Sequence, residues 1–175
     1  MIPLMLHRTC DLGPVRAVTA RIRATEIGCE AEFRLDGTLE GVVLPPAGPA
    51  IRTDGLWRST CFEVFWQSIG EEGYREFNFA PSGQWAAYAF DRHRDGMREA
   101  PVEGISVSAS HASSQGTGGM VLTASLAADL AAPAQVGLSA VIEQAGGGLQ
   151  YWALAFPPGP PDFHSEACRQ VIVER

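Results

Sequence analysis

Short segments in which polar and apolar residues alternate, separated by turn residues, cover most of this 175-residue chain. Alternation with a period of two is typical of β-strands, because successive side chains of a strand point to opposite faces of a sheet. No amphipathic segment of ten or more residues, which the helices of an α/β fold would need, lies between them. The pattern therefore predicts an all-β chain: a single-domain antiparallel β-sandwich over residues 1–175, jelly-roll or immunoglobulin-like, with about ten strands.

The strands are expected in segments bounded by Gly, Pro and Asp residues. They are two strands within 17–37, followed by 39–45, 60–66, 74–79, 85–90, 104–114, 118–129, 136–144, 149–156 and 168–174. The only helical expectation is one or two turns in the Ala-rich stretch near Ser125–Ala132.

Charge and cysteine usage narrow the class of protein. The net charge is −7, and all 13 basic residues are Arg without a basic cluster, which argues against nucleic acid and anionic membrane surfaces as partners. The apolar segment before His7 is too short for a signal peptide, and no apolar run reaches 18 residues, so a cytoplasmic protein is expected. The four isolated cysteines are expected to be reduced and mostly buried. A homo-oligomer is left open.

The aromatic-rich stretch 56–90 sets glutamates among its apolar residues at strand spacing. Pairing the apolar faces of 60–66 and 74–79 as a hairpin places Phe62 opposite Phe77, and Glu63 opposite Glu76 on the second face. The same parity carries through the turn to 85–90. It puts Trp85 on the core face, and Asn78, Tyr88 and Phe90 on the second face with the two glutamates. Two opposed carboxylates repel, so an arginine, a cation, a ligand or a shared proton must offset them.

Three interpretations of this second face remain open. It is either a solvated outer face, a sugar site in which flat rings cover the pyranose and planar polar groups bind its hydroxyls, or a glycosidase-like acid and base pair. No other catalytic motif and no zinc-spaced histidine pair accompanies it, so neither catalytic residues nor a metal site are predicted. His93 and Met97 could be haem ligands in principle, but their four-residue spacing on a loop does not suit opposite faces of a haem.

Three motifs, W-R-x-T-C-F-E, E-F-N-F-x-P-S-G-x-W and P-D-F-H, run in order from Trp57 to His164. In them the chain resembles the DOMON-like proteins, in particular the bacterial murB-like group related to family-9 carbohydrate-binding modules. The resemblance implies a β-sandwich of about ten strands that binds sugar or haem in a cleft, and it does not imply an active site. The positions that match the motifs are Trp57, Arg58, Thr60, Glu63, Glu76, Asn78, Trp85, Tyr88, Arg94, Trp152, Asp162 and His164.

Together these observations predict a non-catalytic module that binds a carbohydrate or sugar conjugate, without a cofactor. Trp57, Trp85 and Tyr88 would supply stacking surfaces. The remaining site residues would supply polar groups, and they are Arg58, Glu63, Glu76, Asn78, Arg94 and His164. The alternatives are a haem-binding or redox module, which a Soret band would reveal, and a protein-interaction domain, which an exposed apolar patch would favour.

Overall fold

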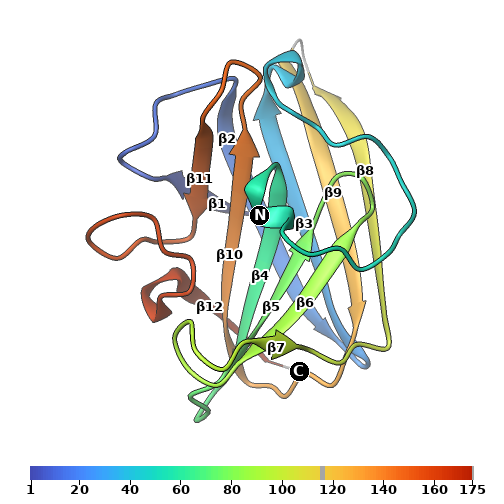
Figure 1. Cartoon of the computed structure of the whole chain (residues 1–175), viewed down its shortest axis with the longest axis vertical. Helices are drawn as coiled ribbons and strands as arrows, with labels where there is room; N and C mark the ends of the chain where they lie inside the picture. Colours follow the sequence, from blue (N-terminus) through green and yellow to red (C-terminus); the bar gives the residue numbers. More distant parts are fainter. Residues whose placement is uncertain (115–116, 175) are drawn as a thin grey trace.

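The computed structural model describes residues 1–114 and 117–174, with only the backbone for 112–114 and 117. It is all-β, a single domain built from a curled antiparallel sheet, as the alternation predicted (Figure 1). The strands are β1 (Ile2–Leu6), β2 (Val15–Thr25), β3 (Gly28–Gly37), β4 (Cys61–Ser68), β5 (Tyr74–Phe79), β6 (Trp85–Phe90), β7 (Arg98–Glu99), β8 (Gly104–Ser114), β9 (Thr117–Ala127), β10 (Ala134–Glu143), β11 (Leu149–Ala153) and β12 (Arg169–Val173).

The helical elements are short 3-10 turns: η1 (Leu39–Gly41), η2 (Leu56–Arg58) and η3 (Glu166–Cys168). Across the described residues, no helix has the length and apolar character needed to cross a membrane.

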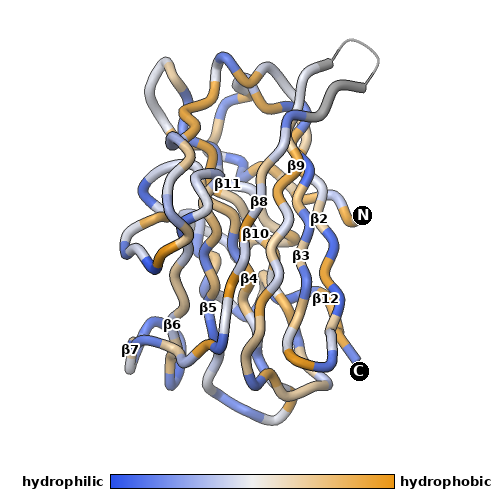
Figure 2. The backbone as a smooth tube through the Cα atoms, turned by 90° about the vertical axis from the view of Figure 1, so that its right-hand side faces the viewer, coloured by the Kyte–Doolittle hydropathy of each residue, from blue (hydrophilic) through white to orange (hydrophobic). Residues whose placement is uncertain are grey.

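The sheet folds back on itself into two layers. Its strand order is β7-β6-β5-β4-β10-β11-β1-β2-β3-β9-β8, and β12 pairs with β10 beside β11. β1 pairs with β11 on one side and β2 on the other, so it joins the layer of β4–β7 and β10–β12 to the layer of β2, β3, β8 and β9. Phe33 of β3 meets Phe62 of β4 across the layers, with ring centroids 5.1 Å apart. This sandwich core follows from the alternation of hydrophilic and hydrophobic residues along the strands (Figure 2).

Several segments differ from the sequence prediction, among them the short β7, which was not expected. The expected strand at 39–45 forms η1 instead, with one isolated bridge from Val42 to Gln144. The expected helical turns at 125–132 are absent, because β9 continues to Ala127 and Pro133 follows shortly after. There, the ladders to β3 and β8 outweigh the helix propensity of alanine. The N-terminal β1, which was not predicted, joins the two layers.

The cysteines are free thiols, and Cys29, Cys61 and Cys168 are buried, as expected. Cys10 is partly exposed.

The layer that contains β4, β5 and β6 is covered on both faces, so the interpretation of the second face as a solvated surface is wrong. Every residue of β4 from Cys61 to Gln67 is buried. Phe65 of β4 lies with the even-numbered side chains of β6 in a second apolar cluster that includes Tyr88 and Phe163. Phe163 comes from the loop between β11 and η3, and this loop covers the face on which Glu63 and Glu76 lie.

Candidate functional site

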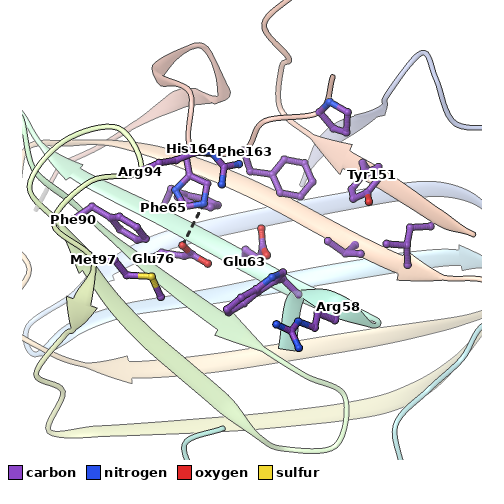
Figure 3. A pocket seen from close by; sticks show the side chains of 14 residues that line it. Arg58, Glu63, Phe65, Glu76, Phe90, Arg94, Met97, Tyr151, Phe163 and His164 are labelled. Atoms are coloured by element: carbon purple, nitrogen blue, oxygen red, sulfur yellow. Dashed lines mark ion pairs between the residues drawn. The ribbon is translucent and has the colours of Figure 1, made fainter. Parts of the chain in front are cut away.

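A cavity of about 430 Å³ opens on the second face of β4, β5 and β10, at the place where the aromatic-rich stretch predicted a site (Figure 3). Its lining combines aromatic, aliphatic and charged side chains from strands, η2 and two loops. The lining residues are Trp57, Arg58, Glu63, Phe65, Glu76, Phe90, Arg94, Met97, Val141, Leu149, Tyr151, Pro161, Phe163 and His164.

Glu63 and Glu76 form the floor of the cavity. They are diagonal neighbours in the sheet and are not directly opposed. In the β4–β5 ladder Glu63 pairs with Asn78, and Phe65 pairs with Glu76. The predicted pairing of Glu63 with Glu76 is therefore wrong by two residues, although each side chain lies on the predicted face. A shift of two leaves every side chain on its own face, so the apolar pattern could not distinguish the two registers.

Each of these carboxyl groups has one oxygen held by a neutral donor. Ser139 Oγ of β10 donates to Glu63 Oε2 at 2.8 Å, and Asn78 Nδ2 donates to Glu76 Oε1 at 2.7 Å. Glu63 is 2% and Glu76 5% exposed, and both carboxyl groups point into the cavity (Figure 3). The second oxygen of each accepts no hydrogen bond from a group that the structure describes. Both glutamates can therefore still bind a donor that enters the cavity.

Burial disfavours the ionisation of both carboxyl groups of the floor at the same time. Burial, followed by the charge of Glu76, raises the pKa of Glu63 to about 8, against the smaller opposing effects of Ser139 and Arg94. Burial also raises the pKa of Glu76, although the hydrogen bond from Asn78 and the charge of Arg94 oppose it. At neutral pH the pair of carboxyl groups therefore holds at least one proton.

His164 forms part of the wall above Glu76 as a neutral ring. It packs edge-on against Phe65 and Phe90, with centroids 5.2 Å and 5.0 Å away, and its Nδ1 lies 2.8 Å from the hydroxyl of Tyr74. Burial, then the charge of Arg94, lowers the pKa of His164 to about 4. Its Nε2 is 3.7 Å from Glu76 Oε2, which is too long for a hydrogen bond, and with a neutral ring it is no ion pair.

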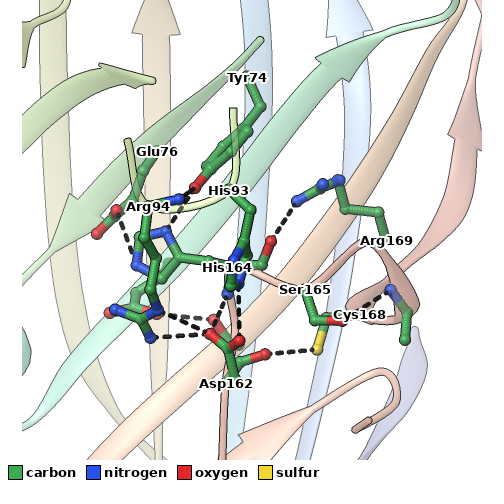
Figure 4. Close-up of polar contacts among 12 residues, drawn as sticks. Tyr74, Glu76, His93, Arg94, Asp162, His164, Ser165, Cys168 and Arg169 are labelled. Carbon is green, nitrogen blue, oxygen red and sulfur yellow. Dashed lines mark hydrogen bonds and ion pairs between the residues drawn. The ribbon is translucent and has the colours of Figure 1, made fainter. Parts of the chain in front are cut away.

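Asp162 anchors the loop that carries His164 (Figure 4). Its Oδ1 accepts from Arg94 Nε at 3.1 Å and Nη2 at 2.8 Å, and its Oδ2 lies 2.8 Å from His93 Nε2. Burial raises the pKa of Asp162, but the hydrogen bonds from His93 and Arg94 outweigh it and hold this pKa below its usual range. Arg94 adopts a left-handed backbone conformation, with φ of 57°, and its N–H donates to the Tyr74 hydroxyl at 3.1 Å. The P-D-F-H motif is thus both a structural anchor and a wall of the cavity.

Arg169 also holds the loop that carries His164. Its Nη1 donates to the carbonyl of His164 at 3.0 Å, and its Nε donates to Gln67 Oε1 at 2.9 Å. Its guanidinium also lies over the ring of Tyr74, 4.8 Å from the centroid. Strands β4, β5 and β12 therefore hold the wall of the cavity in place.

The opposite rim is formed by η2. Trp57 is 37% exposed and meets Tyr88 edge-on, with centroids 5.9 Å apart. Tyr88 is buried beneath it and donates its hydroxyl to Asp54 Oδ1 at 2.6 Å. Arg58 is exposed at the mouth. Trp57 therefore offers the most accessible aromatic surface at this rim.

The structure brings together most of the predicted site residues but not all. Six line the cavity: Trp57, Arg58, Glu63, Glu76, Arg94 and His164. Asn78 and Tyr88 lie just beneath, where they hold Glu76 and Trp57. Trp85 lies on the opposite face, packed against the main core and under the guanidinium of Arg52, so it cannot stack on a ligand in this cavity.

Two further motif positions are structural. Thr60 is buried and its hydroxyl accepts from the backbone N–H of Glu143 at 3.1 Å. Trp152 packs in the main core. Neither lines the cavity.

Several lining residues were not predicted as site residues. Phe65 and Phe90 share the parity of Glu63 and Glu76, so the alternation already placed them on this face. Tyr151 and Phe163 come from β11 and the following loop, and no local pattern predicts how these pack over β4. Met97 lines the cavity, whereas His93 bonds Asp162, so the two do not face a common site. Among the described residues, no group of three or more His, Cys, Asp or Glu could hold a metal ion.

Comparisons with known proteins identify a likeness of fold. No protein-family model matches the chain, and no curated protein matches it. A solved structure from Bacteroides uniformis, described as that of a "putative carbohydrate-binding protein", aligns with a TM-score of 0.62 and 14% sequence identity. The alignment covers 99% of this chain and 85% of that one. At this identity the likeness shows a shared β-fold, and the resemblance to DOMON-like proteins stays a prediction from the motifs.

Proposed function

We propose that the protein is a non-catalytic binding module that takes a carbohydrate or sugar conjugate in the cavity between η2 and the 161–164 loop. The observation that carries the proposal is a floor of two buried glutamates, each with one carboxyl oxygen open to the cavity, beneath aromatic walls. The volume, about 430 Å³, is within the range of roughly 300–1,000 Å³ usual for small-molecule sites. The likeness in fold to the Bacteroides uniformis protein agrees with this proposal.

Each part of the cavity suits one feature of a sugar. The ring of Trp57 at the rim can cover the apolar face of a pyranose, because C–H groups pack well on an aromatic surface. The planar carboxyl groups of Glu63 and Glu76 can accept hydrogen bonds from hydroxyls. Arg58 at the mouth can bind a further hydroxyl or an anionic substituent. We assign no reaction to the site.

A thermal-shift and calorimetric screen of monosaccharides, disaccharides and sugar phosphates tests the proposal. A ligand at ten times its dissociation constant adds about 1.4 kcal/mol of stability. For a domain of this size, that raises the unfolding midpoint by about 3–6 °C. Trp57→Ala should abolish the shift, whereas Ile51→Ala, which removes an exposed apolar side chain outside the cavity, should leave it unchanged. The proposal would be contradicted if no sugar raised the unfolding midpoint, or if Trp57→Ala did not weaken the binding.

A further inference from the structure

The floor of the cavity has acceptors without donors. Glu63 is 98% buried, yet its Oε1 accepts no hydrogen bond from a described group and points into the cavity (Figure 3). Glu76 Oε2 likewise accepts no hydrogen bond from the described residues, and His164 Nε2 lies 3.7 Å from it. Neither oxygen is fully buried, so both can accept a hydrogen bond from a donor that enters the cavity.

Among the described residues, no cationic side chain donates a hydrogen bond to either carboxyl group, although the charge of Arg94 acts on both of them. Arg94 directs its guanidinium to Asp162, whose other oxygen is bound by His93. His164 is uncharged at neutral pH because burial lowers its pKa. Arg58 is at the exposed mouth, where water and salt screen its charge. The two carboxyl groups are thus opposed mainly by the neutral donors Ser139 and Asn78.

The walls are suited to a cation as well. Phe65, Phe90 and Tyr151 border the cavity above the floor. An ammonium group is attracted to aromatic faces within about 6 Å, and this attraction grows when water is excluded. A neutral hydroxyl would gain little from these rings beyond apolar contact.

We propose that the ligand is an amino sugar whose free ammonium group binds at the floor between Glu63 and Glu76. The inference rests on the proposed function and narrows it to one class of carbohydrate. The ammonium donates to the free oxygen of each carboxyl group and offsets their mutual repulsion. The sugar ring then extends toward Trp57, and Arg58 meets the substituents at the outer end.

Binding of a cation must then displace protons. The pair of glutamates holds at least one proton at neutral pH, and an ammonium between the carboxyl groups favours their ionised forms. The other titratable and charged groups that face the pair or line the cavity are Cys61 on β4, Tyr74 on β5, Tyr88 on β6, Arg58 on η2, Arg94 on the 91–97 loop, His164, and Tyr151 on β11, whose pKa is raised by burial. Cys61, Tyr74 and Tyr88 have raised pKa values and stay protonated, and His164 stays neutral, so released protons come from the glutamates.

The test is isothermal titration at pH 6.5 with matched trios of sugars. Glucosamine, galactosamine and mannosamine are each compared with their N-acetyl derivatives and with the parent hexoses. At least one amino sugar should bind tenfold or more tightly than both of its partners. Titration in two buffers of different ionisation enthalpy should show proton release for the amino sugar and none for the parent hexose. This measurement uses the unaltered protein and does not depend on any variant folding.

Variants locate the effect. Glu63→Gln and Glu76→Gln should each reduce the affinity for the amino sugar to about that for its parent hexose and remove the proton release. Glu99→Gln, which neutralises a carboxylate of which 72% of the side chain is exposed, serves as the control and should change neither.

The possible failures are distinguishable. Equal affinity for all three members of every trio would refute the amino-sugar inference and leave the carbohydrate proposal standing. Binding of methylammonium as tight as that of any amino sugar would show a cation site without sugar recognition, which refutes the inference as stated. No binding by any sugar would contradict both proposals.

Discussion

Glu63 should make the protein less stable as the pH rises above neutrality. Its pKa is raised to about 8 in the folded protein by burial and by Glu76, against 4.5 for an unperturbed glutamate. Between these two values the folded state holds a proton that the unfolded state has released. The free energy of unfolding therefore falls as the pH rises through this window. Below pH 4.5 both states are protonated, and the contribution of Glu63 is constant.

His164 acts with the opposite sign over part of the same window. Its pKa is lowered to about 4 from 6.5, so between these values the unfolded state binds the extra proton and stability rises with pH. From about pH 4.5 to 6.5 the two effects oppose each other, and the raised pKa of Glu76 adds to the effect of Glu63; from 6.5 to 8 His164 no longer contributes and the titration of Glu63 lowers the stability. One and a half pH units at about 1.4 kcal/mol per unit give a loss of about 2 kcal/mol. This corresponds to a fall of about 4–8 °C in the unfolding midpoint.

Urea unfolding at several pH values between 6.5 and 8 measures this loss in the protein and in Glu63→Gln. The glutamine can still accept the hydrogen bond from Ser139, so the variant should fold and should keep a nearly constant stability across this range. At the upper end it should be more stable than the unaltered protein. Glu99→Gln, on the exposed β7, should follow the unaltered protein. An equal fall in Glu63→Gln would refute the assignment of the effect to this carboxyl group.

Two further changes test the walls of the cavity. Phe163→Ala should lower the free energy of unfolding by about 3 kcal/mol. This value is at the lower end for a buried phenylalanine because the ring of Phe163 already borders the cavity. Urea unfolding measures the loss, with Ile172→Ala as the exposed control. Arg94→Gly and Arg94→Ala both remove the ion pair with Asp162, but only glycine relieves the left-handed backbone at φ of 57°. Arg94→Gly should therefore be more stable than Arg94→Ala by about 1 kcal/mol, and equal stabilities would contradict the backbone argument.

The division of side chains between faces could be predicted from the sequence because a strand has a fixed period of two. Phe62, Val64 and Trp66 lie in the main core, and Glu63 and Glu76 lie together on the other face, as the alternation required. The burial of that second face could not be predicted in the same way. It depends on the 154–168 segment, which returns from β11 to cover β4 and β5. This segment is held in place by single contacts between residues that are far apart in the sequence. Asp162 and Arg94, for example, are 68 positions apart.

The misplacement of Trp85 has a similar origin. Its parity was predicted correctly, since it lies with the core face and pairs with Phe79. The sequence prediction nevertheless included it among the stacking surfaces, because an aromatic residue within the motifs looked suited to a sugar. A site on one face of a two-faced sheet cannot use a side chain of the other face. Parity should therefore have excluded Trp85 from the site that contains Glu63.

The register that the sequence could not distinguish decides what the floor of the cavity can hold. Directly opposed residues on antiparallel strands have Cβ atoms about 4.5–5.5 Å apart, whereas diagonal neighbours are about 7–8 Å apart. With Glu63 opposite Glu76, the two carboxyl groups would share one proton at close range and leave little space between them. In the observed register Asn78 and Phe65 occupy the opposed positions, and Asn78 takes one oxygen of Glu76. The two glutamates are thereby diagonal neighbours, and the space between them is the place that the amino-sugar proposal assigns to the ammonium group.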